Sequence, residues 1–304
     1  MKRITELVNS GRLLVGDGAW GTSLQELGLA AGECAESWNE LHRDRVLSVA
    51  TSYVSAGANL IETNSFGGSR IKLASYQLQD KTARLNRNAA EISREAAGKN
   101  VLVLGSIGPT GKFLITGSVT QAELTDAFRE QAVALQNGGA DALCLETFYD
   151  LDEARCAVIA ARENTDLEII CTFTFDKKPD GSFKTMMGID PKTVAENLLN
   201  WKVDIIGTNC GNGFGDMVSI VAEMRSVDPD IPILVQANAG LPKMDGDKIF
   251  YPETPETVAQ IVPQLVKAGA NIIGGCCGTN QAHIREIRKT LLQHFPDKLY
   301  AANA

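Results

Sequence analysis

Three cysteines in the second half of the chain have the setting of metal ligands. Cys276 and Cys277 stand together in the segment GGCCGT, residues 274–279, directly after an apolar run. Cys210 follows another apolar run, at residues 203–206. Thiolates are soft ligands that zinc binds in tetrahedral geometry. Three protein ligands would leave the fourth position to water or substrate, which is typical of a catalytic zinc site.

The adjacent pair requires an unusual backbone. Neighbouring side chains in a strand point to opposite faces, so Cys276 and Cys277 can share a metal only if the backbone leaves the strand between them. Glycines at positions 274, 275 and 278 supply the necessary freedom. Two other interpretations stay open: a pair of small buried side chains, and a vicinal disulfide with its strained geometry. The matching thiol at Cys210 favours the metal.

The composition is that of an ordinary globular protein, with 304 residues, 44% hydrophobic and 22% charged. A formal net charge of −8 argues against nucleic acid as the partner. The N-terminus lacks a signal-peptide pattern, and no apolar run approaches the roughly 18 residues that a membrane span needs. Seven cysteines without a disulfide-scaffold spacing favour a reducing compartment. We therefore expect a cytoplasmic protein without membrane association, whose remaining thiols are core or surface residues, at Cys34, Cys144, Cys156 and Cys171.

Eight short apolar runs alternate with helical patterns along the chain. Most runs are continuous, as expected of strands buried on both faces of a parallel sheet. They cover residues 13–15, 60–62, 101–104, 142–145, 168–175, 203–206, 233–235 and 271–273. Amphipathic helical spacing occurs at residues 46–54, 124–135 and 258–265, and Pro263 should bend or shorten the last of these helices. The alternation predicts a single-domain (β/α)8 TIM barrel over residues 1–304, with a doubly wound open sheet as the alternative.

Polar or glycine-rich segments follow nearly every apolar run. They include GDGAWGT at residues 16–22, ETNSFG at 62–67, GSIGPTG at 105–111, ETF at 146–148 and QANAG at 236–240. An open sheet would concentrate its chemistry at one switch point, whereas a barrel brings all the carboxyl ends of its strands to one face. The spread of these segments along the whole chain therefore favours the barrel.

Taken in order, these segments and the cysteine motifs resemble the zinc- and homocysteine-dependent S-methyltransferase family. Within that family, they are most similar to the homocysteine-binding barrel of cobalamin-dependent methionine synthases. The resemblance runs from Leu13 to Arg288 and departs at Ala237, where methionine synthases often carry proline. It implies a (β/α)8 barrel, a catalytic zinc on the three cysteines, and an enzyme that methylates homocysteine to methionine. Zinc would supply the nucleophile, because a coordinating thiol is deprotonated.

The resemblance also implies how the substrate is held. Glu146, with Asp17 as a second candidate, would bind the ammonium group of homocysteine. Backbone amides of residues 18–22, from Gly18 to Thr22, would bind its carboxylate, and Asn238 would line the same pocket. From the residues alone, Asp17 could instead cap the first turn of a helix. Glu62 and Glu146 could form the carboxylate pair of a glycosidase, an interpretation that the thiol cluster disfavours.

The methyl donor is less well defined by the sequence. Methionine synthases continue into folate- and cobalamin-binding modules, whereas the present sequence ends at Ala304. The resemblance therefore implies that methylcobalamin arrives on a separate corrinoid protein. The alternatives are betaine or S-methylmethionine as the donor, another thiol as the acceptor, and a non-catalytic thiol-binding subunit.

Overall fold

The strands of this computed structural model follow the predicted apolar runs closely, and residues 3–246 and 248–301 are described. Eight strands among them pair in parallel in one sheet: β1 (Leu14–Val15), β2 (Leu60–Glu62), β3 (Leu102–Ile107), β4 (Ala142–Phe148), β5 (Glu168–Phe173), β8 (Ile205–Gly213), β9 (Ile233–Asn238) and β12 (Ile272–Gly275). Their order is β1-β12-β9-β8-β5-β4-β3-β2. Several strands extend past the apolar run into the polar segment that follows it.

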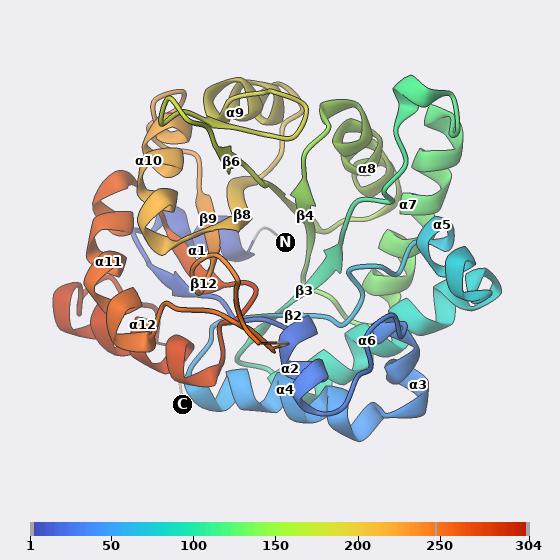
Figure 1. Cartoon of the computed structure of the whole chain (residues 1–304), viewed down its shortest axis with the longest axis horizontal. Coiled ribbons are helices and arrows are strands. Elements are labelled where there is room, and N and C mark those ends of the chain that lie inside the picture. Colours follow the sequence, from blue (N-terminus) through green and yellow to red (C-terminus); the bar gives the residue numbers. More distant parts are fainter. Residues whose placement is uncertain (1–2, 247, 302–304) are drawn as a thin grey trace.

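The sheet curls until its two edge strands meet. Asn59, just before β2, donates its backbone N–H to the carbonyl of Val15 in β1 at 2.7 Å. Its side-chain oxygen accepts the backbone N–H of Val15 at 3.0 Å. Figure 1 shows the strands enclosing the centre of the molecule with the helices around them. The predicted (β/α)8 barrel is confirmed, and the open-sheet alternative is wrong.

Helices cover the outside of the barrel. The longer ones are α4 (Arg43–Ala56), α6 (Thr82–Ala97), α7 (Gln121–Asn137), α8 (Leu151–Asn164), α9 (Pro191–Asn200), α10 (Phe214–Arg225), α11 (Pro255–Ala268) and α12 (Gln281–His294). Shorter ones are α1 (Arg3–Asn9), α2 (Gly21–Glu26), α3 (Trp38–Leu41) and α5 (Arg70–Leu73). Within the described ranges, none is long and apolar enough to cross a membrane.

The predicted helical stretches lie within α4, α7 and α11. Gly57 and Gly269 directly follow α4 and α11, and both have the left-handed backbone that commonly ends a helix. Pro263 does not shorten α11, whose 14 residues extend past it to Ala268. The buried face of this helix, with Val258, Val262 and Leu265, outweighs the single hydrogen bond that the proline removes.

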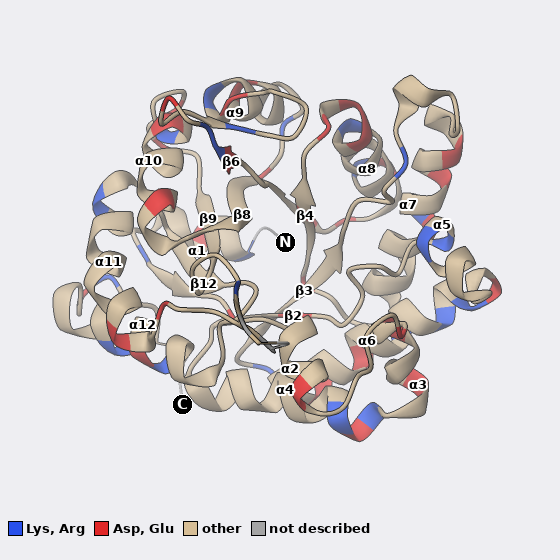
Figure 2. Ribbon diagram, viewed as in Figure 1, with Lys and Arg blue, Asp and Glu red and all other residues tan. Residues whose placement is uncertain are grey.

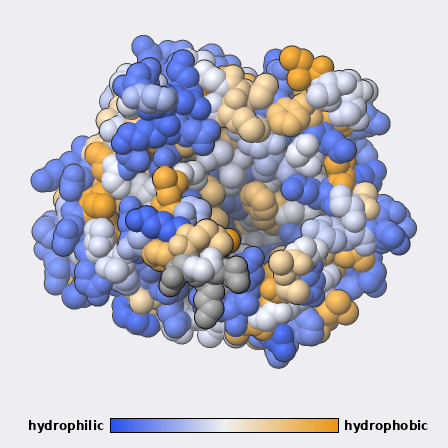
Figure 3. All heavy atoms as spheres, viewed as in Figure 1, coloured by the Kyte–Doolittle hydropathy of each residue, from blue (hydrophilic) through white to orange (hydrophobic). Residues whose placement is uncertain are grey.

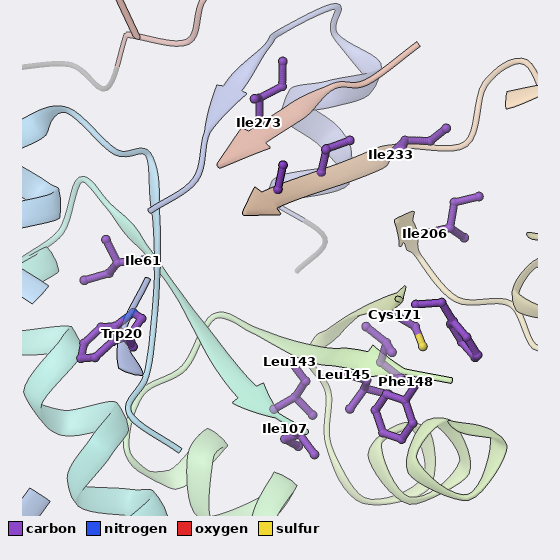
Figure 4. Close-up of a cluster of buried hydrophobic side chains, with 14 of the residues drawn as sticks. Trp20, Ile61, Ile107, Leu143, Leu145, Phe148, Cys171, Ile206, Ile233 and Ile273 are labelled. Carbon is purple, nitrogen blue, oxygen red and sulfur yellow. The ribbon is translucent and has the colours of Figure 1, made fainter. Parts of the chain in front are cut away.

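Two hydrophobic layers hold the barrel together. The inner layer fills the barrel, with Leu14, Leu104 and Ile170 among its members. The outer layer lies between strands and helices, and Figure 4 shows Leu143 and Phe148 as part of it. The side chains of both layers are almost completely buried, so most of the hydrophobic stabilisation is expected to come from them.

Helix α1 closes the end of the barrel where the strands begin. Ile4 and Val8 bury their side chains against the inner layer. The backbone N–H groups of Ile4 and Thr5 donate to the carboxylate of Glu168, both at 2.8 Å. The opposite end, where the strands finish, is therefore the end that can hold a ligand.

Two hairpins that the sequence did not predict stand at this ligand-binding end. One pairs β6 (Asp176–Lys177) with β7 (Phe183–Lys184), and the other pairs β10 (Lys243–Asp245) with β11 (Lys248–Phe250). Their strands are two or three residues long, too short to leave an alternating pattern in the sequence. Figure 2 shows most charged residues on the helices and loops rather than on the barrel strands.

Candidate active site and metal centre

A cavity of about 350 Å³ opens at the end of the barrel where the strands finish. This volume lies within the range of small-molecule sites. Figure 3 shows the hollow at the centre of this face. The cavity is lined by Gly18, Ala19, Trp20, Gly21, Thr22, Ala35, Glu36, Glu62, Thr63, Asn64, Ser65, Phe66, Ser106, Glu146, Thr147, Cys210, Gln236, Gly275, Cys276 and Cys277.

The three predicted metal ligands meet at one wall of this cavity. The sulfur atoms of Cys210, Cys276 and Cys277 all lie within 4.8 Å of one another. Two thiolates bound about 2.3 Å from a tetrahedral zinc lie about 3.8 Å apart, and Cys276 Sγ is 3.9 Å from Cys277 Sγ. The same distance excludes a vicinal disulfide, whose sulfurs are about 2 Å apart. These three cysteines are partly exposed, unlike the four remaining cysteines, which are buried as expected of core thiols.

A bulge in β8 turns Cys210 toward the cavity. The register between β8 and β9 shifts between Asn209 and Gly213, which places extra residues in β8 at this point. Cys210 has φ +57, a left-handed conformation that is uncommon for a residue with a side chain. Such strained backbone is found at functional sites, where the surrounding fold enforces it.

The adjacent cysteines lie just beyond the end of their strand. Strand β12 finishes at Gly275, and the backbone N–H of Cys276 donates to the carbonyl of Ala237 in β9 at 2.7 Å. A turn follows, closed by a 3.0 Å hydrogen bond from Thr279 N–H to the carbonyl of Cys276, with Gly278 at φ +81. The backbone therefore leaves the strand directly before the pair, and this exit brings both sulfurs to the same side.

The three sulfurs share protons in the absence of a cation. Hydrogen bonds from the thiols of Cys276 and Cys277 strongly lower the pKa of Cys210. Donation to Cys210 raises the pKa of Cys276 and of Cys277. These shifts favour a thiolate at Cys210 and protonated thiols at Cys276 and Cys277 when no metal is bound. A divalent metal would replace the two protons.

Cys210 also receives hydrogen bonds from outside the sulfur cluster. The backbone N–H of Gly211 and the side-chain amide of Asn238 both stabilise its thiolate. Asn238 Oδ1 is buried and lacks a hydrogen-bond partner among the described residues. An unsatisfied oxygen beside three converging thiols is consistent with a cation at this position, and the donor set suits zinc.

Glu146 is held rigidly beside the sulfurs. Its Oε2 accepts a hydrogen bond from Asn209 Nδ2 at 3.1 Å, and its Oε1 accepts one from the hydroxyl of Ser106. Asn209 is itself fixed, since its Oδ1 accepts the backbone N–H of Thr147 at 2.9 Å. A register shift in β4 between residues 145 and 148, with Thr147 at φ +63, directs Glu146 into the cavity. Asn209 thus connects the carboxylate to the neighbouring residue Cys210, one of the three candidate metal ligands.

Two further carboxyl groups lie close to Glu146. Asp17 is completely buried, and its Oδ2 accepts hydrogen bonds from Trp20 Nε1 and from the backbone N–H of Glu62, both at 2.8 Å. Burial raises the pKa of Asp17, Glu62 and Glu146, and charge repulsion from Glu62 adds to the effect on the other two. Asp17 Oδ1 finds no partner within the described chain. A nearby cation would stabilise the ionised forms of these three acidic groups. The cluster therefore suits the binding of a positively charged group.

The segment that follows β1 forms another side of the cavity. Gly18 to Thr22 line it, and α2 starts at Gly21. Tyr53 braces this segment by donating its hydroxyl to the carbonyl of Ala19 at 2.6 Å. The first N–H groups of a helix have no acceptor within the helix, so they remain available to an anionic group.

The predicted site residues occupy different layers of the site. Glu146, the segment from Gly18 to Thr22 and the three cysteines line the cavity. Asp17 and Asn238 are buried behind its walls, where each contacts a residue of the lining. The structure therefore brings all of them to one end of the barrel, but at different depths.

Comparison with known protein families identifies the family to which this barrel belongs. Residues 14–291 match the model of the family described as homocysteine S-methyltransferase. This chain belongs to the homocysteine S-methyltransferase family. The cavity at the end of this barrel has three thiols on one wall and acidic groups on another.

Curated relatives of this homocysteine S-methyltransferase domain are much longer proteins. It is 33% identical over 298 residues to methionine synthase of Mycobacterium tuberculosis, covering 92% of this chain and 25% of that protein. Methionine synthase of Mycobacterium leprae is 32% identical over 294 residues, covering 91% of this chain and 24% of that protein. The chain therefore spans about a quarter of the length of these relatives.

Solved structures show the same fold. The metallated form of the homocysteine methyltransferase MmuM from Escherichia coli superposes with a TM-score of 0.77 at 23% identity, covering 93% of this chain and 97% of that one. The carboxyl transferase domain of Rhizobium etli pyruvate carboxylase has a TM-score of 0.58 at 15% identity, covering 95% of this chain and 45% of that one. At these identities the likeness concerns the barrel alone.

Several residues of the homocysteine S-methyltransferase site had no role assigned from sequence. Ser106 and Asn209, which hold Glu146, stand in strand-end segments, and that position was their only signal. Glu62 was considered only as a glycosidase carboxylate, yet it belongs to the acidic wall of the cavity. Tyr251, which contacts Cys277, follows a hairpin that the sequence pattern did not reveal.

Proposed function

We propose that this chain binds zinc through Cys210, Cys276 and Cys277 and methylates the sulfur of homocysteine, forming methionine. The observation that carries the proposal is the meeting of three sulfurs within 4.8 Å at the wall of a cavity that Glu146 also lines. Zinc would supply a deprotonated substrate thiol at neutral pH, because a coordinating thiol loses its proton. The chain itself supplies the orientation of the amino-acid end.

The acidic wall would bind the ammonium group of homocysteine. Glu146 is the proposed contact, since its two oxygens are already oriented by Ser106 and Asn209. Asp17 and Glu62 lie behind it, where burial raises the pKa of both carboxyl groups, and a bound ammonium group would favour their ionised forms. A substrate fixed at its ammonium end can present its sulfur at a constant position relative to the cysteines, which lowers the entropic part of the barrier.

The opposite end of the substrate would meet the segment from Gly18 to Thr22. Backbone amides there border the cavity and suit a carboxylate. Asn238, expected to line the pocket, is better placed to act on Cys210, whose thiolate its amide stabilises. We therefore assign Asn238 to the metal centre rather than to the substrate.

The proposed donor is methylcobalamin on a separate corrinoid protein. A large donor must approach from solvent over the end of the barrel where the strands finish, and the loops there expose apolar side chains. Ile115 is 85% exposed, Met186 59% and Met244 64%, and each lies in a segment that connects a barrel strand to the next outer helix. Figure 3 shows hydrophobic residues around the hollow on this face. Apolar residues that surround an open site support contact with a second macromolecule.

A parallel assay tests the function and the donor together. Zinc-loaded protein is incubated with homocysteine and, in separate reactions, methylcobalamin, betaine or S-methylmethionine, and methionine is measured. Methionine formed with methylcobalamin supports the proposal. Methionine formed only with betaine or S-methylmethionine would show that the proposed donor is wrong. Homocysteine binding without product from any donor would support a non-catalytic thiol-binding subunit. The variant Cys210→Ala is the negative control in each reaction.

A further inference from the structure

Tyr251 lies directly after β11 and reaches the metal-ligand loop. Its ring covers Gly278, the residue after Cys277. A Cβ atom added to Gly278 would lie 2.1 Å from Cγ and 2.5 Å from Cβ of Tyr251, so only glycine allows this approach. The phenol group of Tyr251 is also close enough to the sulfur of Cys277 to lower the pKa of that thiol.

The segment that carries Tyr251 is hydrogen-bonded to the elements around the proposed metal centre. The backbone N–H of Glu253 donates to the carbonyl of Ala239 at 2.9 Å, and Ala239 N–H donates to the carbonyl of Cys277 at 3.0 Å. The carboxylate of Glu253 accepts the backbone N–H of Phe214 at 3.1 Å. The carbonyl of Glu253 lies 3.0 Å from His283 Nε2 in α12. Tyr251 is therefore held by the ends of β8 and β9 and by the loop after β12.

We propose that Tyr251 is a positioning residue of the metal centre, whose hydroxyl donates a hydrogen bond to the metal-bound sulfur of Cys277. This inference rests on the metal site proposed above. A phenol is a hydrogen-bond donor at neutral pH, and a thiolate sulfur is an acceptor. The bond orients the sulfur and withdraws electron density from it, which tunes the metal it binds. Hydrogen bonds to metal ligands typically change metal affinity by about 10- to 100-fold.

The neighbouring ligand Cys210 supports this assignment. It receives hydrogen bonds from the N–H of Gly211 and from the amide of Asn238, both from outside the sulfur cluster. Tyr251 gives Cys277 the corresponding outside donor. The alternative is that the Tyr251 ring only fills space over Gly278. The variant Tyr251→Phe distinguishes the hydrogen-bonding role from the space-filling role, because it keeps the ring and removes the hydroxyl.

The test compares zinc affinity in the wild-type chain, Tyr251→Phe and Tyr76→Phe. Tyr76 is 44% exposed on the outside of the barrel and serves as the matched control. Affinity is measured by competition with a chromophoric chelator, and the cobalt-substituted proteins are compared by absorption spectroscopy. We expect Tyr251→Phe to bind zinc about 10- to 100-fold more weakly and to shift the sulfur-to-cobalt charge-transfer band. Tyr76→Phe should match the wild type in both measurements.

The two proposals fail in different ways. A wild-type chain that binds no zinc would overturn the metal site and with it the proposed function. A wild-type chain that binds zinc, together with Tyr251→Phe of equal affinity and an unchanged cobalt spectrum, would overturn only the role of Tyr251. Thermal unfolding of the metal-free proteins shows whether the variant keeps its fold, which the retained ring predicts.

Discussion

Replacing Glu146 by glutamine should separate substrate binding from metal binding. Glutamine keeps the shape of the side chain and can still pair with its neighbours. Its oxygen accepts from Asn209 Nδ2, and its amide donates to Ser106, whose hydroxyl serves as donor or acceptor. The substitution therefore removes the negative charge with little change in packing. A neutral amide cannot match a carboxylate as partner for an ammonium group.

The expected loss follows from the strength of hydrogen bonds to charged groups. Such a bond contributes about 1.5–3 kcal/mol, which corresponds to an affinity for homocysteine weaker by about 10- to 150-fold. Isothermal titration of the zinc-loaded protein measures this affinity. Metal analysis of Glu146→Gln should show a full complement of zinc. The matched control is Glu153→Gln, since Glu153 is also buried but binds the loop at Thr110 outside the cavity.

A substrate analogue sharpens the experiment. The compound 4-mercaptobutyrate has the thiol and carboxylate of homocysteine but lacks its ammonium group. The wild-type chain should bind this analogue more weakly than homocysteine, whereas Glu146→Gln should bind both with similar affinity. The reasoning is refuted if Glu146→Gln retains the wild-type preference for homocysteine, or if its weaker binding accompanies loss of zinc.

The same variant predicts a pH-dependent change in stability. Burial raises the pKa of Glu146 above its ordinary value of 4.5, so the folded state holds this proton more tightly than the unfolded chain. This tighter proton binding contributes to the free energy of unfolding. The contribution is fully present below pH 4.5 and is lost as the pH rises through the pKa of the folded state. Glutamine does not titrate. The melting temperature of metal-free Glu146→Gln should therefore rise relative to wild type as the pH is raised above 4.5.

Further predictions concern the metal and the barrel. Cys210→Ala should lose zinc and activity together, whereas the core variant Cys156→Ala should keep both; metal analysis and the methionine assay measure this. Zinc uptake should release about two protons, so apparent affinity should rise by about 100-fold per pH unit while both thiols stay protonated; titration in buffers of different ionisation enthalpy measures the release. Gly207→Ala should destabilise the protein by at least about 1–3 kcal/mol, because its Cβ would lie 2.2 Å from a backbone carbonyl oxygen of β9. Gly215→Ala, which meets nothing within 4 Å, is its control in denaturant unfolding.

Each of these has a contradicting result. Full zinc in Cys210→Ala would remove that cysteine from the ligand set. Zinc uptake without proton release would mean that the cluster holds thiolates before the metal arrives. A Gly207→Ala variant as stable as Gly215→Ala would show that β8 and β9 can separate at low cost.

The sequence alone determined the barrel and located the three cysteines that we propose as metal ligands. Parallel strands buried on both faces must be continuous apolar runs, so the runs located all eight strands. Because the carboxyl ends of barrel strands share one face, Cys210 and the pair Cys276 and Cys277 could be placed together before their distance was known. The order of strand-end motifs then pointed to the family.

Only the tertiary structure decided how these residues work together. The bulges that turn Cys210 and Glu146 into the cavity depend on register with neighbouring strands, and no local pattern encodes that register. The burial that raises the pKa of Asp17 comes from residues distant in sequence. The contact between Tyr251 and Cys277 joins a hairpin too short for periodicity to a separate strand end. Such features arise from packing between distant segments, so they become visible only once the chain is folded.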